Sequence, residues 1–105
     1  MQPIKGILRE ELNNSLHMKE SYERELSKLP IGSLVRKKIK DHYYYYLVSR
    51  VDGRVKFEYR GKASKAEVKK NEEVKVLRAK YRNLLSRSKK QIKFIRGTLR
   101  GEKTI

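Results

Sequence analysis

The sequence predicts an α+β fold: an N-terminal helix, a three-stranded antiparallel β-meander and a long C-terminal helix, with the two helices packed as an antiparallel pair. At both ends of the chain, apolar residues recur every three or four positions, as they do in amphipathic helices. Between these segments, runs of β-branched and aromatic residues are separated by turn-forming dipeptides, which indicates strands. A length of 105 residues fits one domain, so we expect a single domain over residues 1–105.

The first helix is expected over residues 4–29, where most apolar side chains fall on one stripe. These are Ile4, Leu8, Leu12, Leu16, Tyr22, Leu26 and Leu29. Pro30 and Gly32 end the helix. Residues 1–32 carry five basic and five acidic side chains, so this helix reads as a packing element and not as a binding surface.

Three strands are expected at residues 33–40, 42–51 and 54–60. The Asp52-Gly53 dipeptide predicts a two-residue type I′ turn, because both turn positions need positive φ. That turn pairs Val48 with Phe57, Tyr46 with Tyr59 and Tyr44 with Gly61. A second two-residue turn, at Lys40-Asp41, pairs Lys37 with Tyr44 and Val35 with Tyr46.

Both registers place the same residues on one apolar face of the sheet. They are Val35, Ile39, Tyr44, Tyr46, Val48, Val55, Phe57 and Tyr59. We expect the two helices to cover this face, with Tyr44, Tyr46 and Tyr59 in the core. The opposite face is basic and is expected to be the outer surface.

The second helix is expected over residues 64–99. Ser64 and Glu67 have the spacing of a capping box, in which each side chain accepts a hydrogen bond from the other residue's backbone N–H. Its apolar seam is Val74, Leu77, Tyr81, Leu84, Ser88, Ile92, Ile95 and Leu99. A helix of this length is about 50 Å long, so its seam needs a partner, either the first helix or another chain.

The formal net charge is +16, and it lies entirely after residue 32. From Val74 to Gly101 there are ten basic residues and no acidic residue. At 100° per residue, seven of these form one stripe on the helix. The stripe residues are Lys75, Arg78, Arg82, Lys89, Lys93, Arg96 and Arg100. Like charges one turn apart weaken a helix, and a phosphate ligand would offset that repulsion.

Composition and motifs argue against several other functions. The chain has no cysteine, which removes disulfides, thiol catalysis and cysteine-based zinc sites. No apolar run is long enough to span a membrane and no signal peptide is recognisable, so we expect a cytoplasmic protein without a membrane partner. His17 and His42 have no evident catalytic or metal-binding company. We therefore expect no enzyme activity, no metal and no cofactor.

The main hypothesis is nucleic-acid binding through the basic sheet face and the helix stripe, with duplex DNA expected rather than RNA. The sheet candidates are Arg36, Lys38, Tyr43, Tyr45, Arg54, Lys56 and Arg60. Alternatively, Tyr43 and Tyr45 only pack across the strands on the stems of Arg36 and Lys38, and the basic faces are merely solvated. A second hypothesis is a protein-interaction or oligomerisation module, in which the helical seams recruit a partner or a second copy.

Residues 33–85 resemble the arm-type, AP2-like DNA-binding domains of tyrosine recombinases. The residues that carry this resemblance are YYYYLV at 43–48 and DGRVKFEYRGK at 52–62. The resemblance implies a sheet laid in the major groove, with Arg36, Lys38, Arg54, Lys56 and Arg60 at the base- and phosphate-contacting positions. The chain departs from that pattern in its longer second helix, its leading helix and its lack of a recombinase catalytic domain. The segment also resembles short uncharacterised bacterial proteins, a similarity that implies no function.

Overall fold

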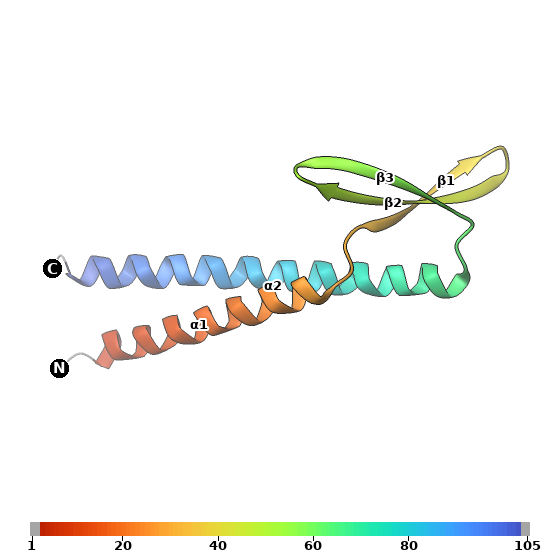
Figure 1. Ribbon diagram of the computed structural model, residues 1–105. Coiled ribbons are helices and arrows are strands. Elements are labelled where there is room, and N and C mark those ends of the chain that lie inside the picture. The colour runs from red at the N-terminus through yellow and green to blue at the C-terminus, as the bar shows by residue number, and fades with distance from the viewer. Residues whose placement is uncertain (1–2, 104–105) are drawn as a thin grey trace. The chain divides into compact units, whose positions relative to one another are not determined.

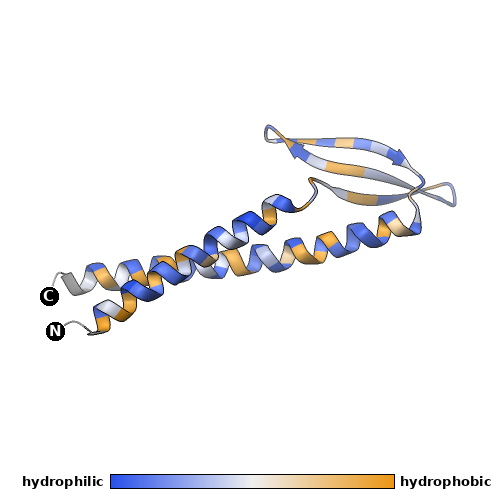
Figure 2. Ribbon diagram, turned by 60° about the horizontal axis from the view of Figure 1, so that its bottom comes forward, coloured by the Kyte–Doolittle hydropathy of each residue, from blue (hydrophilic) through white to orange (hydrophobic). Residues whose placement is uncertain are grey.

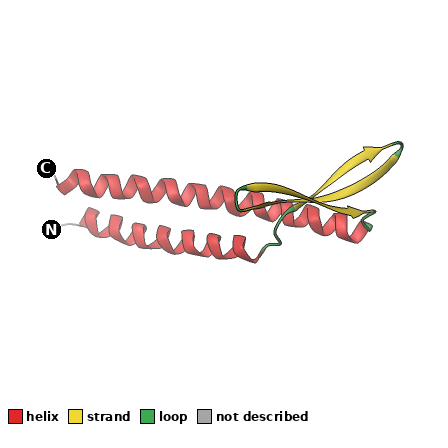
Figure 3. Cartoon of the chain, turned by 45° about the horizontal axis from the view of Figure 1, so that its top comes forward, coloured by secondary structure: helices red, strands yellow, loops and turns green. Residues whose placement is uncertain are grey.

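The computed structural model describes residues 3–103, with side chains from residue 4 to residue 101, and confirms the predicted order of elements (Figure 1). The elements are α1 (Pro3–Lys28), β1 (Ser33–Ile39), β2 (His42–Val51), β3 (Arg54–Gly61) and α2 (Lys65–Lys103). Along the chain, the three strands follow α1 and precede α2 (Figure 3). Residues 1, 2, 104 and 105 of the expected domain lie outside the described residues.

The predicted element ends differ from the observed ones by at most one residue, except at the end of α2. That helix continues from Leu99 to Lys103, so Gly97 and Gly101 are accommodated within it. At its start, the Ser64 Oγ accepts a hydrogen bond of 3.2 Å from the Glu67 backbone N–H. This is the Ser64 half of the predicted capping box, and it satisfies one of the free donors of the first turn.

Two compact units make up the chain: α1 together with α2 from Ala79 onward, and the segment Leu29–Arg78. In the first unit, α1 and α2 pack against each other as the predicted antiparallel pair (Figure 1). Apolar residues recur along both helices, and apolar and polar residues alternate along β3 (Figure 2).

The closest-packed part of the helical unit is formed around two serines. The rings of Tyr22 and Tyr81 meet with centroids 6.2 Å apart. Ser15 and Ser88 each lie seven residues from that contact, so the antiparallel helices bring them to the same level. Both are buried, at 3% and 7% exposure, and such small side chains permit a close approach of the two helices.

Buried apolar residues continue this core along α2. Ile92 and Ile95 are the buried apolar residues of the described chain, and both belong to the predicted seam. On α1, the predicted stripe is half-buried from Leu8 to Leu29, but Ile4 is exposed. The seam from Tyr81 to Leu99 therefore has a partner within the chain, whereas Leu77 is 39% exposed, and the packed stripe of α1 begins at Leu8.

The second unit contains the antiparallel sheet, with strand order β1-β2-β3. The register confirms the predicted pairs from both turns, among them Lys37 with Tyr44 and Val48 with Phe57. Both turns have positive φ at each central position: 47° and 60° at Lys40 and Asp41, and 52° and 78° at Asp52 and Gly53. These angles are those of type I′ turns.

One predicted pair is wrong. Gly61 pairs with Tyr45 and not with Tyr44, because the β2–β3 ladder is irregular between Tyr45 and Tyr46. Tyr46 pairs with Tyr59, so Arg60 is an extra residue on β3. Gly61 adopts φ 76°, a left-handed conformation that suits glycine and helps to close the irregularity.

The predicted covering of the apolar face is wrong for the start of α2: within the unit Leu29–Arg78, this part of the helix leaves that face open. Val55, Phe57 and Tyr59 are 52%, 58% and 60% exposed. The start of α2 lies instead against the middle of the opposite, basic face. There Leu34, Leu47 and Arg60 share a small cavity of about 260 Å³ with Asn71 and Val74.

The cause is a local apolar pair within the basic face. Leu34 and Leu47 lie directly opposite each other on β1 and β2 and offer α2 an apolar contact. The Leu34 backbone N–H also donates a hydrogen bond of 3.1 Å to Asn71 Oδ1 of α2. Since β1 is an edge strand, this bond gives a partner to a donor that the sheet leaves free.

Candidate nucleic-acid interface

The cations of the predicted helix stripe gather most closely in the helical unit, where a groove of about 610 Å³ follows α2. Seven residues line this groove, of which five are basic: Lys19, Lys89, Ile92, Lys93, Arg96, Leu99 and Arg100. We call it the basic groove. It contains four of the seven predicted stripe residues, with Lys19 contributed by α1.

The helical repeat explains why these side chains meet. Lys89, Lys93, Arg96 and Arg100 follow one another in steps of four, three and four residues, which keeps them on one side of α2. Their backbone positions span about 16 Å along the helix axis. One strand of duplex DNA passes about five phosphates over that length.

The apolar residues of the groove are buried more deeply than the cations. Ile92 is buried and Leu99 half-buried, while Lys89, Lys93, Arg96 and Arg100 are exposed. The long aliphatic stems of such side chains can lie along the apolar floor while their charged ends stay in water. The groove therefore offers positive charge at its rim above an apolar base.

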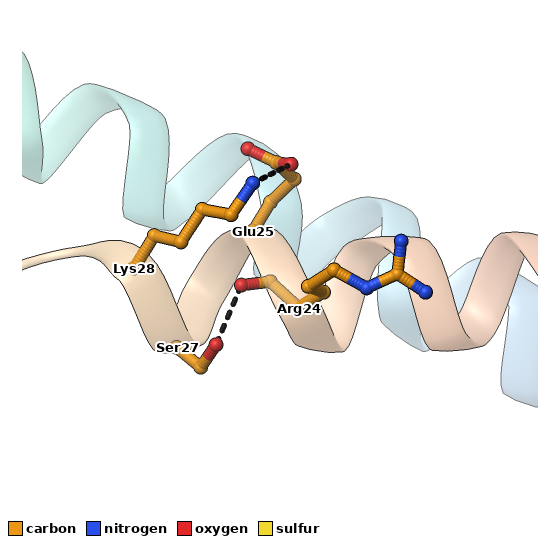
Figure 4. Close-up of polar contacts among 4 residues, drawn as sticks. All are labelled: Arg24, Glu25, Ser27 and Lys28. Atoms are coloured by element: carbon orange, nitrogen blue, oxygen red, sulfur yellow. Dashed lines mark hydrogen bonds and ion pairs between the residues drawn. The ribbon is translucent and has the colours of Figure 1, made fainter.

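The four α2 cations form no ion pair with any residue between 4 and 101, the range whose side chains are described. The ion pairs of α1 are local to that helix: Lys19 Nζ lies 3.7 Å from Glu23 Oε1, and Lys28 Nζ lies 3.2 Å from Glu25 Oε1 (Figure 4). The acidic residues of these two pairs thus offset bases of α1 itself, and the four α2 cations of the groove have no acidic partner within residues 4–101.

The other three stripe residues have different surroundings. Lys75 and Arg82 are exposed on α2. Arg78 is committed within the protein, because its guanidinium donates hydrogen bonds to Ser33 Oγ at 3.1 Å, Pro30 O at 2.6 Å and Gly32 O at 3.2 Å. We therefore leave Arg78 out of the candidate interface.

The basic face of the sheet keeps its predicted membership but is less uniform than expected. Arg36 lies over the Tyr43 ring, with its guanidinium carbon 4.3 Å from the centroid, which is the cross-strand packing anticipated for that tyrosine. Arg60 pairs with Glu58 at 3.7 Å and lines the cavity under α2. Tyr45 is half-buried. Lys38 is exposed at one end of the sheet, and Arg54 and Lys56 are exposed toward the other end, on either side of the part that α2 contacts.

Sequence reasoning missed two features. Lys19 is not among the predicted binding residues, and its place in the groove follows from the antiparallel pairing of α1 with α2. Lys37 is not among the predicted binding residues either, yet its Nζ lies 5.3 Å and 5.6 Å from the ring centroids of Tyr46 and Phe57. The predicted register already placed Lys37 beside these rings and was the available signal.

Within the described residues, no group of three or more His, Cys, Asp or Glu side chains is arranged to hold a metal ion. The helices of the described chain include none long and apolar enough to cross a membrane.

Comparison with known proteins gives one family. Residues 4–70 match the family described as Domain of unknown function (DUF6788), and the chain belongs to that family. Neither the curated proteins nor the solved structures contain a significant match. The similarity to short uncharacterised proteins is consistent with this result, and none of the comparisons supports the resemblance to recombinase DNA-binding domains.

Proposed function

We propose that this DUF6788 member binds nucleic acid, with duplex DNA as the expected ligand, and that the basic groove is the principal phosphate-binding surface. The observation that carries the proposal is the alignment of Lys89, Lys93, Arg96 and Arg100 in one groove without acidic neighbours in its lining. Repulsion between like charges one turn apart weakens a helix. A ligand with regularly spaced negative charges reverses that cost.

The basic sheet face supports the proposal with further exposed cations, Lys38 at one end of the sheet and Arg54 and Lys56 toward the other. The proposal includes a cytoplasmic location and a binding role without catalysis, metal or cofactor. The alternative, a protein-interaction module built on the helical seams, has less support. The central seam residues Ile92 and Ile95 are already buried within the chain.

A matched pair of charge reversals tests the proposal. Lys93→Glu with Arg96→Glu changes the groove, and Lys80→Glu with Arg87→Glu makes the same charge change at exposed positions of α2 outside it. The groove variant should bind a duplex of about 20 base pairs at least about tenfold more weakly than the control variant in a gel-shift assay.

Folding should survive the groove substitutions, because the new carboxylates lie one helical turn from Lys89 and Arg100 and form opposite-charge pairs. Circular dichroism checks this point. An equal loss of duplex affinity in both variants would mean that binding depends only on net charge and not on the groove. Unchanged duplex affinity in the groove variant would refute the proposed surface.

A further inference from the structure

The open aromatic face of the sheet has no role in the proposed function so far. It was expected to be core, but Phe57 and Tyr59 are well over half exposed. Tyr44, Tyr46, Phe57 and Tyr59 lie on this face together with Lys37. We infer that this face binds unpaired nucleic-acid bases by stacking, so that the protein accepts single-stranded nucleic acid at the sheet.

The rings form a connected surface across two strands. The centroids of Tyr46 and Tyr59 are 5.4 Å apart with planes at 63°, and those of Tyr44 and Tyr59 are 6.3 Å apart at 38°. Val48 pairs with Phe57, which places the Phe57 ring next to the Tyr46–Tyr59 pair along the strands. Every base has a flat π-face, so a row of exposed rings holds successive bases without regard to sequence.

Lys37 lies beside two of these rings. Its Nζ is 5.3 Å from the ring centroid of Tyr46 and 5.6 Å from that of Phe57. A lysine side chain is flexible, so a base can take its place over the rings while the amine moves to a phosphate. The same residue thus covers the rings in the free protein and adds a backbone contact in the complex.

The charge of this face favours a polyanion over other occupants. Its residues on the three strands include Lys37 and Arg50 and no acidic side chain. The whole unit Leu29–Arg78 carries fourteen basic and six acidic residues. A second copy docked face to face would bring two such positive units together, whereas a nucleic-acid strand would neutralise them.

The inference rests on the proposed function, since its ligand is nucleic acid, but it concerns another surface and can fail separately. The test compares a dT oligonucleotide of about 12 nucleotides with a duplex of equal length. Binding is followed by fluorescence anisotropy and by quenching of tyrosine emission, which is not obscured because the chain has no tryptophan. Phe57→Leu with Tyr59→Leu removes two rings and keeps apolar bulk. Phe57→Tyr with Tyr59→Phe keeps both rings and is the matched control.

The leucine variant should bind the oligonucleotide more weakly, by between about 5-fold and about 150-fold for each ring lost. Its duplex binding should stay within about twofold, and the aromatic control should bind both probes like the original protein. Unchanged oligonucleotide binding by the leucine variant, or equal loss for both probes, would overturn the inference.

Two further outcomes separate this inference from the proposed function. Salt-sensitive duplex binding without oligonucleotide binding would sink the inference and leave the proposed function standing. If the protein bound neither the oligonucleotide nor the duplex, both the inference and the proposed function would be refuted. Sedimentation gives a last check, because a dimer that dissociates in the leucine variant would identify the face as a contact between copies and contradict the inference.

Discussion

The arginines of the predicted stripe have different roles, which depend on their neighbours: some are exposed in the basic groove and one forms hydrogen bonds within the protein. Arg96 and Arg100 line the basic groove. Arg78 instead joins α2 to the segment before β1 through Ser33, Pro30 and Gly32. The guanidinium suits this second task because it presents several donors in a fixed plane to several oxygens at once.

Replacement of Arg78 by methionine should therefore lower stability. Arg78→Met keeps much of the apolar stem but removes three hydrogen bonds, and hydrogen bonds to a charged group contribute about 1.5–3 kcal/mol. We expect a loss of at least about 2 kcal/mol in the free energy of unfolding, measured by urea denaturation. Arg82→Met, an exposed position on the same helix with the same charge change, is the control. Similar stability of the two variants would show that Arg78 has no structural role.

At the scale of the elements, the two hairpin turns are of one type but differ in how well their residues suit it. Asp52-Gly53 has glycine at the second left-handed position, whereas Lys40-Asp41 holds two non-glycine residues at φ 47° and 60°. Left-handed conformations are unfavourable for residues other than glycine, asparagine and aspartate. The β1–β2 turn is thus under more backbone strain than the β2–β3 turn.

Substitution of that turn by the preferred dipeptide should stabilise the sheet. Lys40→Asn with Asp41→Gly relieves the strain, removes one charge of each sign and leaves the net charge unaltered. We expect a gain of about 1 kcal/mol and a higher Tm by thermal denaturation. Asp52→Asn, in the turn that already has glycine, should change stability by only a few tenths of that. A lower Tm in the double variant would mean that Lys40 or Asp41 makes a contact of its own.

The elements and their registers could be predicted because turn chemistry and periodicity are local. Both type I′ turns fix which residues pair, and the Ser64 cap fixes where α2 begins. The packing of the sheet could not be predicted this way. The prediction placed the helices on the face with more apolar residues. The start of α2 instead packs against the opposite face, where Leu34 and Leu47 lie opposite each other. The irregularity at Arg60 could not be predicted either, because apolar and polar residues alternate regularly along β3 up to that position.

The candidate site shows the same division. The helical repeat alone predicted that Lys89, Lys93, Arg96 and Arg100 share one side of α2, and they line one groove. It could not predict the contribution of Lys19, which depends on how α1 packs, nor the commitment of Arg78, which depends on a segment about 45 residues away in the chain. Long-range partners, not local patterns, separate a structural cation from a free one.

For the whole molecule, the unequal division of charge is the main physical fact. Residues 1–32 are neutral and the remaining residues carry the entire excess of +16. Most domains of this size mix their surface charges, and net charges of about 2–8 already keep them soluble. The concentration of unpaired cations in the basic groove is therefore the basis of the proposed anionic ligand.

The salt dependence of duplex DNA binding tests this account most directly. If each of the four unpaired cations of the basic groove meets one phosphate, the logarithm of the association constant should fall with the logarithm of the salt concentration, with a slope of about −3.6. Contacts from the sheet would steepen it. The slope should become shallower by about 1.8 in the Lys93→Glu, Arg96→Glu variant. A slope near zero, or one that the groove variant leaves unchanged, would contradict binding through the groove.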